Sequence, residues 1–337
     1  MIRDAISKLV ENRPLTREEA RGVLLTIMSG EATPAQIAAF VTALRIRGET
    51  PEVIAGCAQA MRECLTPVRA SGDVVDTCGT GGDASNTFNI STAAALVAAG
   101  AGVKVAKHGN RSVSSRCGSA DVLAALGVDT ACPPAVMERC LERIGVAFLF
   151  APTMHPAMKH AIGPRREIGI RTVFNILGPL SNPAGARRGV LGVFSAAMVP
   201  VIARAAAELG AERMFVVHGS DGLDEITLTG PTEVGEAAAG GVRLWTLDPA
   251  RLGFARCAAS DLKGGDPPEN AAILRRVLDG ERGPRRDIVV LNAAAAILAG
   301  GSADDWPPAV ASAARAIDSG AARGKLEALV RETRAGA

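Results

Sequence analysis

From Val74 onward, short apolar runs alternate with helical segments rich in alanine and leucine, and this alternation constrains the fold more than any other feature. The helical segments are about ten to fifteen residues long, which is the pattern of repeated βαβ units. Such units predict an α/β fold with a central, mostly parallel sheet that has helices on both faces. The predicted strands are Val74–Asp76, Val103–Ala106, Val146–Phe150, Val190–Phe194 and Met214–His218.

The last third of the chain departs from this alternation. Two apolar stretches, near Ile226–Leu228 and Val242–Leu247, are predicted to add antiparallel strands to the sheet. From about Glu269 the periodicity is helical again. We therefore expect residues 71–337 to form one large α/β domain.

Residues 1–70 predict helices alone. Thr16 and Glu19 have the spacing of a capping box, and the pairs Thr33-Pro34 and Thr50-Pro51 begin the next two helices. A helical block this short cannot bury its own apolar faces well, so it should pack on the rest of the chain or on a second subunit. We expect a small N-terminal helical domain that forms the interface of a homodimer.

Composition and charge exclude several classes of protein. Lys+Arg 37 against Asp+Glu 35 leaves a net charge of +2, and aromatic residues make up only 3%, so the chain lacks the features of a nucleic-acid-binding protein. The seven cysteines are scattered, which is typical of reduced thiols. There is no signal-peptide pattern, and the longest apolar stretches are too short to span a membrane. We expect a soluble, cytoplasmic protein with no membrane or nucleic-acid partner.

The most informative polar segment lies between a predicted strand and a predicted helix, at residues 76–92. Its glycines allow backbone N–H groups to converge on an anion, and the helix that begins near Asn89 adds its positive end. The segment matches neither the P-loop nor the dinucleotide-binding fingerprint. Taken alone, it is also compatible with an ordinary glycine-rich turn. The residues in question are Gly79, Gly81, Gly82, Ser91 and Thr92.

A second polar loop, Lys107–Ser115, follows the predicted strand Val103–Ala106 and leads to a helix that Ser119 should cap. Its cations, amide and hydroxyl groups suit a phosphate or pyrophosphate. Because ligands bind at the carboxyl ends of parallel strands in open α/β sheets, this loop and the glycine-rich segment should lie at one site.

A third loop, His218–Glu225, gathers three carboxylates after the strand Met214–His218. The adjacent Asp224 and Glu225 suit Mg²⁺, which takes one or two protein carboxylates and completes its shell with water and phosphate oxygens; a turn with incidental acids is equally compatible. The basic run that ends at Thr172 is, by itself, typical of a solvated face. No nucleophile pattern and no zinc-ligand spacing stand out.

Together these segments resemble the anthranilate phosphoribosyltransferase family, from about residue 10 to beyond residue 300. The motifs that carry the resemblance are Gly79–Asp83, Asn89–Thr92, Lys107–Ser112, Arg171–Leu180 and Asp224–Ile226. The resemblance implies a fold of the nucleoside phosphorylase/phosphoribosyltransferase type, in which part of residues 165–190 joins the helical domain. It implies transfer of ribose 5-phosphate from phosphoribosyl pyrophosphate (PRPP) to the amine of anthranilate, with Mg²⁺ as cofactor, in tryptophan biosynthesis. It also implies a homodimer joined through the helical domain.

The resemblance also assigns residues to ligands. Anthranilate would contact Gly79, Asn110 and Arg165, and Mg²⁺ would use Ser91, Asp224 and Glu225. No residue is a certain catalytic group: Lys107 would act electrostatically, and His108 lies near the acceptor. The sequence departs from the family pattern at Ala84, where glycine is usual, and at Arg116-Cys117, where Lys-Ser is common. The residues implied for PRPP are Gly79, Gly82, Asp83, Thr87, Asn89, Ile90, Ser91, Thr92, Lys107, His108, Gly109, Asn110, Arg111, Ser112, Val113, Ser114, Ser115 and Ser119.

These residues suit the chemistry that the resemblance implies. When ribosyl C1 loses pyrophosphate, positive charge develops at C1 and negative charge on the leaving group, so a metal ion, Lys107 and loop amides can act electrostatically. Two alternatives remain at this stage. A pyrimidine nucleoside phosphorylase-like enzyme would share the architecture, but its Lys-His-Ser-Thr-Gly-Gly loop is absent. A non-catalytic PRPP-binding module would not need Asp224-Glu225 together with an aromatic acid site.

Overall fold

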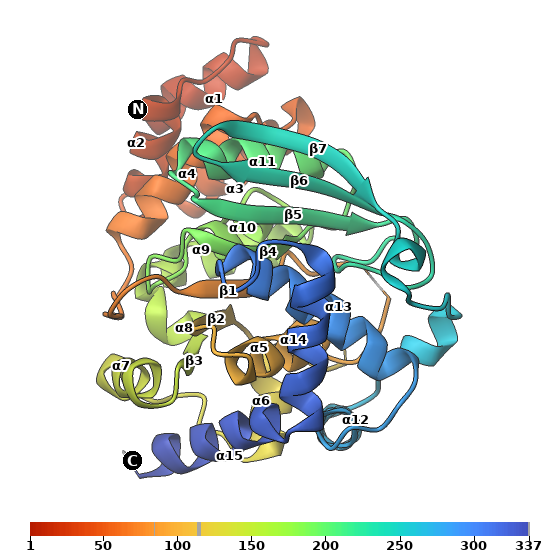
Figure 1. Ribbon diagram of the computed structural model, residues 1–337. Coiled ribbons are helices and arrows are strands. Elements are labelled where there is room, and N and C mark those ends of the chain that lie inside the picture. The colour runs from red at the N-terminus through yellow and green to blue at the C-terminus, as the bar shows by residue number, and fades with distance from the viewer. Residues whose placement is uncertain (84, 113–115, 336–337) are drawn as a thin grey trace.

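Seven strands form one central sheet in the computed structural model, which describes residues 1–83, 85–112 and 116–335 (Figure 1). The strand order is β3-β2-β1-β4-β5-β6-β7. Strands β1 to β5 run parallel to one another, and β6 and β7 each run antiparallel to the strand before them. This arrangement confirms the predicted fold class. The strands are β1 (Val75–Gly79), β2 (Val105–Gly109), β3 (Val146–Phe150), β4 (Arg188–Gly192), β5 (Arg213–Gly219), β6 (Thr232–Ala238) and β7 (Gly241–Leu247).

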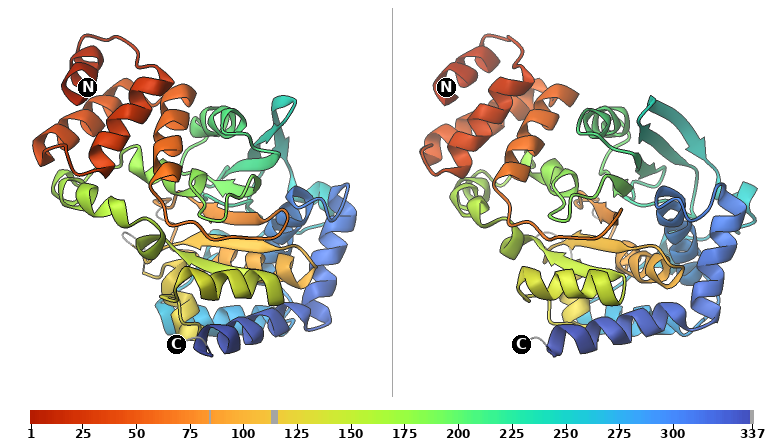
Figure 2. Two further views of the ribbon diagram at one scale, coloured as in Figure 1. Left: turned by 90° about the vertical axis from the view of Figure 1, so that its left-hand side faces the viewer. Right: turned by 60° about the vertical axis from the view of Figure 1, so that its left-hand side comes forward.

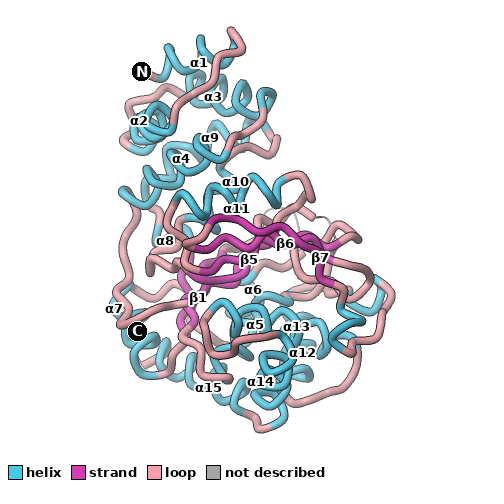
Figure 3. Tube along the Cα trace, turned by 45° about the horizontal axis from the view of Figure 1, so that its top comes forward, coloured by secondary structure: helices cyan, strands magenta, loops and turns pink. Residues whose placement is uncertain are grey.

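Helices from the centre and the end of the chain cover one face of the sheet, as Figure 3 shows below the strands. The central one, α13, buries 13 of its 16 residues, because it is apolar on every side. On the other face, α11 (Met198–Glu208) packs against β5 and β6. The helices on the α13 side of the sheet are α5 (Ile90–Gly100), α6 (Ser119–Leu126), α7 (Pro134–Arg143), α12 (Pro267–Leu278), α13 (Pro284–Ala299), α14 (Trp306–Asp318) and α15 (Ala321–Arg334).

The N-terminal helices form a block at one end of the molecule (Figure 2). They are α1 (Ile2–Val10), α2 (Arg17–Met28), α3 (Pro34–Arg47) and α4 (Pro51–Glu63). Two later helices pack against this block: α9 (Lys159–Ile168) contacts α2 and α3, and α10 (Phe174–Leu177) contacts α4. Helix α11 also packs on α4, so the core of the block continues to the sheet. Short helical turns complete the chain: α8 (Ala151–Met154), η1 (Pro156–Met158), η2 (Gly178–Leu180), η3 (Pro249–Leu252) and η4 (Ala259–Leu262).

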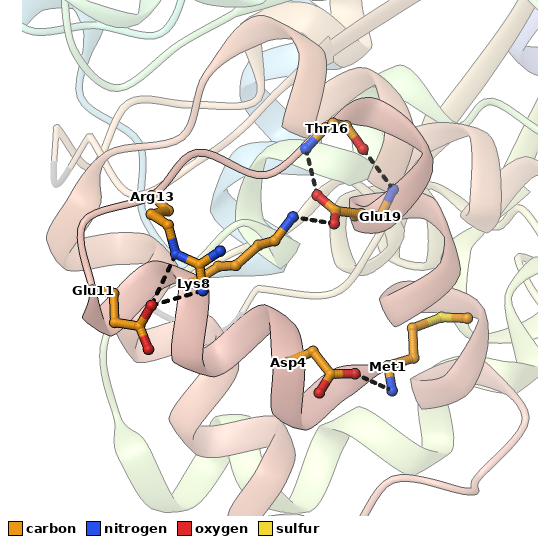
Figure 4. A network of polar contacts seen from close by, with 7 residues as sticks. All are labelled: Met1, Asp4, Lys8, Glu11, Arg13, Thr16 and Glu19. Atoms are coloured by element: carbon orange, nitrogen blue, oxygen red, sulfur yellow. Dashed lines mark hydrogen bonds and ion pairs between the residues drawn. The ribbon is translucent and has the colours of Figure 1, made fainter.

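The predicted helix starts in this block are confirmed. Thr16 Oγ1 accepts from the backbone N–H of Glu19 at 3.2 Å, and the Thr16 N–H donates to the Glu19 carboxylate at 3.0 Å (Figure 4). Lys8 Nζ donates to the same carboxylate and so ties α1 to α2. Thr33 forms the same kind of capping box with Gln36 at α3, and the Thr50 side chain caps α4 by accepting from the Val53 N–H; proline holds the first helical position of both helices.

The strands differ from the predicted ones in their ends. Only Val146–Phe150 has the predicted bounds; β1 and β2 each run three residues further, and β4 begins and ends two residues earlier. Lys107 and His108 therefore lie inside β2, not in the loop after it, and both side chains are buried. The apolar pattern missed this because the partners lie on a neighbouring strand: Lys107 Nζ donates to the Thr77 carbonyl, and the backbone N–H of His108 donates to Asp76.

Two further predictions were wrong. Ile226–Leu228 is no strand, because its backbone groups pair with side chains instead: Asn292 binds the Ile226 backbone, and Thr232 Oγ1 accepts from the Thr227 N–H. The antiparallel partner of β5 is β6, and the predicted strand near Val242–Leu247 is β7. Ser119 does not cap α6 but is its first residue, since Gly118 holds the cap position.

No helix among the described residues is long and apolar enough to cross a membrane.

Candidate active site

Loops that follow β1, β2 and β5 meet at the carboxyl end of the sheet. Strands β1 and β4 end side by side at the pair Gly79 and Gly192, and the loop after β5 carries Asp224 and Glu225 back over β1. Three contacts join these loops: Gly81 N–H donates to Asp224 Oδ2 at 2.8 Å, Ser91 N–H donates to Glu225 Oε1 at 3.1 Å, and Lys107 Nζ donates to Ser91 Oγ at 3.4 Å. The three polar segments identified in the sequence therefore lie together at this edge of the sheet.

The glycine-rich loop depends on its glycines at specific positions. Gly81 and Gly82 have φ of 65° and 79°, in the left-handed region where residues with a Cβ are strained. Gly79 has no such φ, but a Cβ on it would overlap the carboxylate of Asp224. Asp83 accepts from the Ser85 hydroxyl at 2.5 Å. Asp224 can therefore lie over the end of β1 only because residue 79 has no side chain.

The two adjacent carboxylates at 224 and 225 share a poorly solvated position. Burial raises the pKa of Asp224, and the nearby negative charge of Asp83 raises this pKa further. Burial and the charge of Asp224 also raise the pKa of Glu225, while the Lys107 ammonium and the Ser91 N–H oppose this rise. Carboxylates held together in this way favour a cation between or beside them.

Lys107 is the buried cation of the site. Its side chain is 4% exposed, and Nζ donates to the carbonyl of Thr77 on β1 as well as to Ser91. An ammonium group this far from water needs such partners. Lys107 thus places a fixed positive charge between β1 and the first turn of α5, beside Glu225.

A second polar network is centred on Asp76 and Asn182, and no local pattern in the sequence indicates it. Asp76 Oδ1 accepts from the backbone N–H of His108 at 3.0 Å, and Asp76 Oδ2 accepts from Asn182 Nδ2 at 2.7 Å. Asn182 also donates to the carbonyl of Ala106. Burial raises the pKa of Asp76 to about 6, against the opposing effect of Lys107. This network joins β1, β2 and the residues after η2.

Two neutral histidines stand at the end of β2. The rings of His108 and His155 are 5.0 Å apart between centroids, and His108 Nδ1 lies 3.1 Å from the carbonyl oxygen of Gly178. Burial lowers the pKa of His108 to about 3 and that of His155 to about 4. Neither Nε2 has a hydrogen-bond partner among the described residues. The sequence had shown His155 only as part of a basic run.

Arg165 lies in the last turn of α9. Its guanidinium lies 5.2 Å from the centroid of the Phe174 ring, and burial lowers its pKa. Arg165 is therefore half-buried, and the expectation that this basic run is only a solvated face is wrong at this position.

The second polar loop folds against the start of α6. Asn110 and Ser119 bind each other twice, since Ser119 Oγ accepts from the Asn110 N–H and donates to the Asn110 carbonyl, both at 3.2 Å. The Asp121 carboxylate accepts from the N–H groups of Ser112 and Gly118, and Arg111 is 3.9 Å from it. Three of the residues implied for PRPP, Val113, Ser114 and Ser115, lie outside the described residues. Ala84, where the sequence departs from the family pattern, also lies outside them.

The helix that follows the glycine-rich loop is anchored by amide side chains. Asn89 Nδ2 donates to the Cys117 carbonyl, and Asn89 Oδ1 accepts from Cys117 Sγ and from Asn270 Nδ2. Thr87 pairs with Lys263 in an isolated bridge. Ile90 and Thr92 are each 1% exposed, so both residues are buried in the first turn of α5.

Asn292 is a further residue that sequence analysis missed. It lies on the apolar helix α13 and binds both the N–H and the carbonyl of Ile226, at 3.0 and 2.8 Å. In this way it fixes the backbone directly after Glu225. A single asparagine within an alanine- and leucine-rich helix is the signal that could have identified it.

The residues present fit a divalent cation that shares its ligands with a substrate. Asp224, Glu225 and the Ser91 hydroxyl supply hard oxygen donors on adjoining segments. Within the described ranges, no group of three or more histidine, cysteine, aspartate or glutamate side chains could hold a metal ion alone. A cation here would need further oxygens from water or phosphate.

Comparisons with known proteins agree on one family. Residues 71–323 match the α/β domain and residues 3–64 the helical bundle domain of a glycosyl transferase family. The chain is 55% identical to the anthranilate phosphoribosyltransferase of Moorella thermoacetica, over 98% of each chain, and 57% identical to that of Pelotomaculum thermopropionicum, over 99% of this chain and 97% of the relative.

Solved structures give the same result. The anthranilate phosphoribosyltransferase of Thermus thermophilus matches with a TM-score of 0.93 and 47% identity, over 98% of this chain and 99% of that one. The Saccharomyces cerevisiae enzyme in complex with PRPP and Mg matches with a TM-score of 0.91 and 30% identity, over 99% and 98% of the two chains.

Proposed function

We propose that the loops after β1, β2 and β5 carry out the reaction of the anthranilate phosphoribosyltransferase family, to which this chain belongs. In that reaction the 5-phosphoribosyl group of PRPP is transferred to the amine of anthranilate, and pyrophosphate is released. The observation that carries the proposal is the meeting of three loops, in which Asp224 and Glu225 accept from the N–H groups of Gly81 and Ser91 while Lys107 contacts Ser91.

PRPP binds along the glycine-rich loop and the first turn of α5. The N–H groups of this loop and the amino end of α5 favour the phosphate groups, and Lys107 supplies a fixed positive charge. Asn110, Arg111 and Ser119 lie at the end of β2 and complete the phosphate side. The structure supports these roles by bringing the residues to one edge of the sheet.

Asp224, Glu225 and Ser91 would hold Mg²⁺ together with oxygens of PRPP. When bound, the ion neutralises part of the negative charge that develops on the departing pyrophosphate. The chain's own contribution is to keep the two carboxylates beside the phosphate loop, through Gly81, Ser91 and the clamp of Asn292 on Ile226.

Anthranilate binds on the other side, near Arg165 of α9 and the rings of His108 and His155. Arg165 offers a planar fork of donors for the carboxylate of the acceptor, and Asn110 offers an amide. His108 and His155 are neutral at pH 7, so they present polar but uncharged edges near the amine. Gly79 lies between the two sides, at the end of β1.

The residues around C1 promote bond breaking by electrostatics. Lys107 and the loop N–H groups stabilise the leaving pyrophosphate, and no covalent nucleophile is needed. The aromatic amine is already neutral at pH 7, so its lone pair can attack without prior loss of a proton. After the C–N bond forms, water or the acceptor's own carboxylate takes the proton, which leaves His108 no essential role as a base.

The helical block, residues 1–70 with part of 165–190, serves as a small domain that also forms a homodimer. The packing of α9 and α10 on α2, α3 and α4 supports the domain assignment. Exposed apolar side chains on this block support the interface: Ile46 is 81% exposed, Val10 75% and Ile170 48%. Sedimentation of an Ile46→Lys variant, expected to be monomeric, tests the interface.

The enzyme acts in the cytoplasm, in tryptophan biosynthesis. All seven cysteines are free, which supports a reducing compartment. The pathway assignment follows from the product, N-(5-phosphoribosyl)anthranilate, for which the named relatives provide the support.

One assay tests the reaction against its alternatives. Pyrophosphate release from PRPP is measured with and without anthranilate, and we expect release only when both the acceptor and Mg²⁺ are present. A phosphorylase-like enzyme would instead cleave a pyrimidine nucleoside with phosphate, and a non-catalytic module would bind PRPP without turnover. The relatives and structures found support the transferase over both.

A further inference from the structure

We propose that Arg171 is a positioning residue that orients the glycine-rich loop for PRPP from the segment between α9 and α10. The proposal rests on the PRPP site proposed above. Arg171 lies 89 positions after Gly82 in the sequence. It is not among the residues assigned above to PRPP or to anthranilate.

Arg171 contacts the loop directly. Its Nη1 donates to the carbonyl oxygen of Gly82 at 2.8 Å, and its guanidinium lies 4.4 Å from the centroid of the Phe194 ring. A planar guanidinium stacked on an aromatic ring has a fixed direction for its N–H donors. The ring therefore determines where Arg171 can donate.

Phe194 is itself tied to the same loop. Its backbone N–H donates to Thr80 Oγ1 at 3.2 Å, and the Thr80 N–H donates to the Gly192 carbonyl at 2.8 Å. The loop, the residues after β4 and Arg171 thus form a closed set of contacts. Movement of the loop would break all of them together.

The direction of one peptide group follows from this contact. In a planar trans peptide, the carbonyl and the next N–H point to opposite sides. When the Gly82 carbonyl points to Arg171, the Asp83 N–H points away from Arg171, toward the other side of the loop. Gly82 has φ of 79° and can adopt many conformations, so an outside contact is needed to select one.

Two residues therefore restrain this peptide turn from different loops. Asp224 accepts from the Gly81 N–H, and Arg171 donates to the Gly82 carbonyl. Arg171 also brings a positive charge to the phosphate loop through its contact with Gly82.

Arg171 is exposed, so its replacement should leave the fold intact. The test compares Arg171→Ala and Arg171→Lys with Phe194→Leu, and with Arg166→Ala as the control, since Arg166 is also an exposed arginine and lies on α9. Titration calorimetry with PRPP and Mg²⁺ gives the affinity without turnover. Steady-state assays give KM for each substrate, and thermal melting gives stability.

We expect Arg171→Ala to weaken PRPP binding about tenfold, which is the range for loss of one charge-assisted hydrogen bond. The KM for anthranilate should stay within about twofold and Tm within about 3 °C. Lysine keeps the charge without the stacked plane, and leucine at 194 removes the ring, so both variants should fall between alanine and the parent. Arg166→Ala should bind PRPP as the parent does.

Three results would overturn the proposal. The first is unchanged PRPP affinity in Arg171→Ala. The second is an equal loss in Arg166→Ala, which would show a general charge effect. The third is an equal rise of both KM values together with a large fall in Tm, which would show a structural role. A parent enzyme that releases no pyrophosphate would instead refute the proposed function, so the two failures are distinguishable.

Discussion

Gly79→Ala should separate folding from binding of the metal and phosphate. A Cβ at position 79 overlaps the Asp224 carboxylate oxygen and comes within 3.0 Å of Asp224 Cγ, so the side chain of Asp224 must move. That movement breaks the hydrogen bond from Gly81 N–H to Asp224 Oδ2. The backbone of residue 79 itself has no positive φ, so β1 can accept alanine.

The magnitude follows from these two effects. Loss of a hydrogen bond to a charged group costs about 1.5–3 kcal/mol, and one methyl group forced into a packed position costs about 1–3 kcal/mol. The first cost falls on the site, so affinity for PRPP with Mg²⁺ should decrease roughly 10- to 100-fold. The second cost lowers Tm by several degrees at most, because the displaced carboxylate can turn toward solvent.

The assay is titration of PRPP in the presence of Mg²⁺, with thermal melting of the same samples. Gly324→Ala is the matched control, since a Cβ there meets nothing within 4 Å and the position lies within α15. This control should bind PRPP normally and gain up to about 1 kcal/mol of stability. If Gly79→Ala kept PRPP affinity and kcat within about twofold of the parent, the argument that residue 79 must leave room for Asp224 would be refuted.

Four more outcomes are expected. Asp224→Ala with Glu225→Ala should abolish most activity, and calorimetry of the parent should show tight Mg²⁺ binding only when PRPP is present; tight binding to the free enzyme that survives the double change would contradict this. Arg165→Ala should raise KM for anthranilate far more than KM for PRPP, and equal rises would move Arg165 to domain packing. His108→Ala should keep kcat within about tenfold, and a variant as inactive as the metal-site variant with intact substrate affinities would show a catalytic histidine. Burial lowers the pKa of His108 to about 3 and that of His155 to about 4, so between these values and the unfolded value near 6.5 the unfolded chain binds protons that the folded chain does not. Each histidine should therefore cost about 1.4 kcal/mol of stability per pH unit as the pH falls through that window. Replacing both with Asn should flatten the dependence of the unfolding free energy on pH between pH 7 and pH 5, and an unchanged slope would contradict the buried neutral state.

The sequence alone identified the loops that the structure brings together at the candidate site. Each loop has a local signal: glycines at positions 79, 81 and 82, the mixed cations and hydroxyls after position 107, and the adjacent acids at 224 and 225. The helix caps at Thr16, Thr33 and Thr50 were equally predictable. Such signals are readable because a cap, a tight turn or an apolar run depends on residues within a few positions of each other.

The ends of the strands were less predictable for a related reason. An apolar run predicts a strand only while its residues are apolar, so the pattern ended at Ala106, although β2 continues through Lys107 and His108 to Gly109. On the neighbouring strand β1, the Thr77 carbonyl accepts from Lys107 Nζ, and Asp76 accepts from the His108 backbone N–H. The strand's true end depends on partners that the local sequence does not contain.

The tertiary structure alone decided which residues support the loops. Arg171 meets Gly82, Asn182 meets Asp76, and Asn292 meets Ile226, over separations of 89, 106 and 66 residues. Nothing in the local pattern distinguishes such a residue from a solvated arginine or asparagine, because its role is defined by the backbone group that it reaches. The sequence determined the chemical groups of this site, and the packing of distant segments determined their directions, because a hydrogen bond requires its donor and acceptor to be placed together in space.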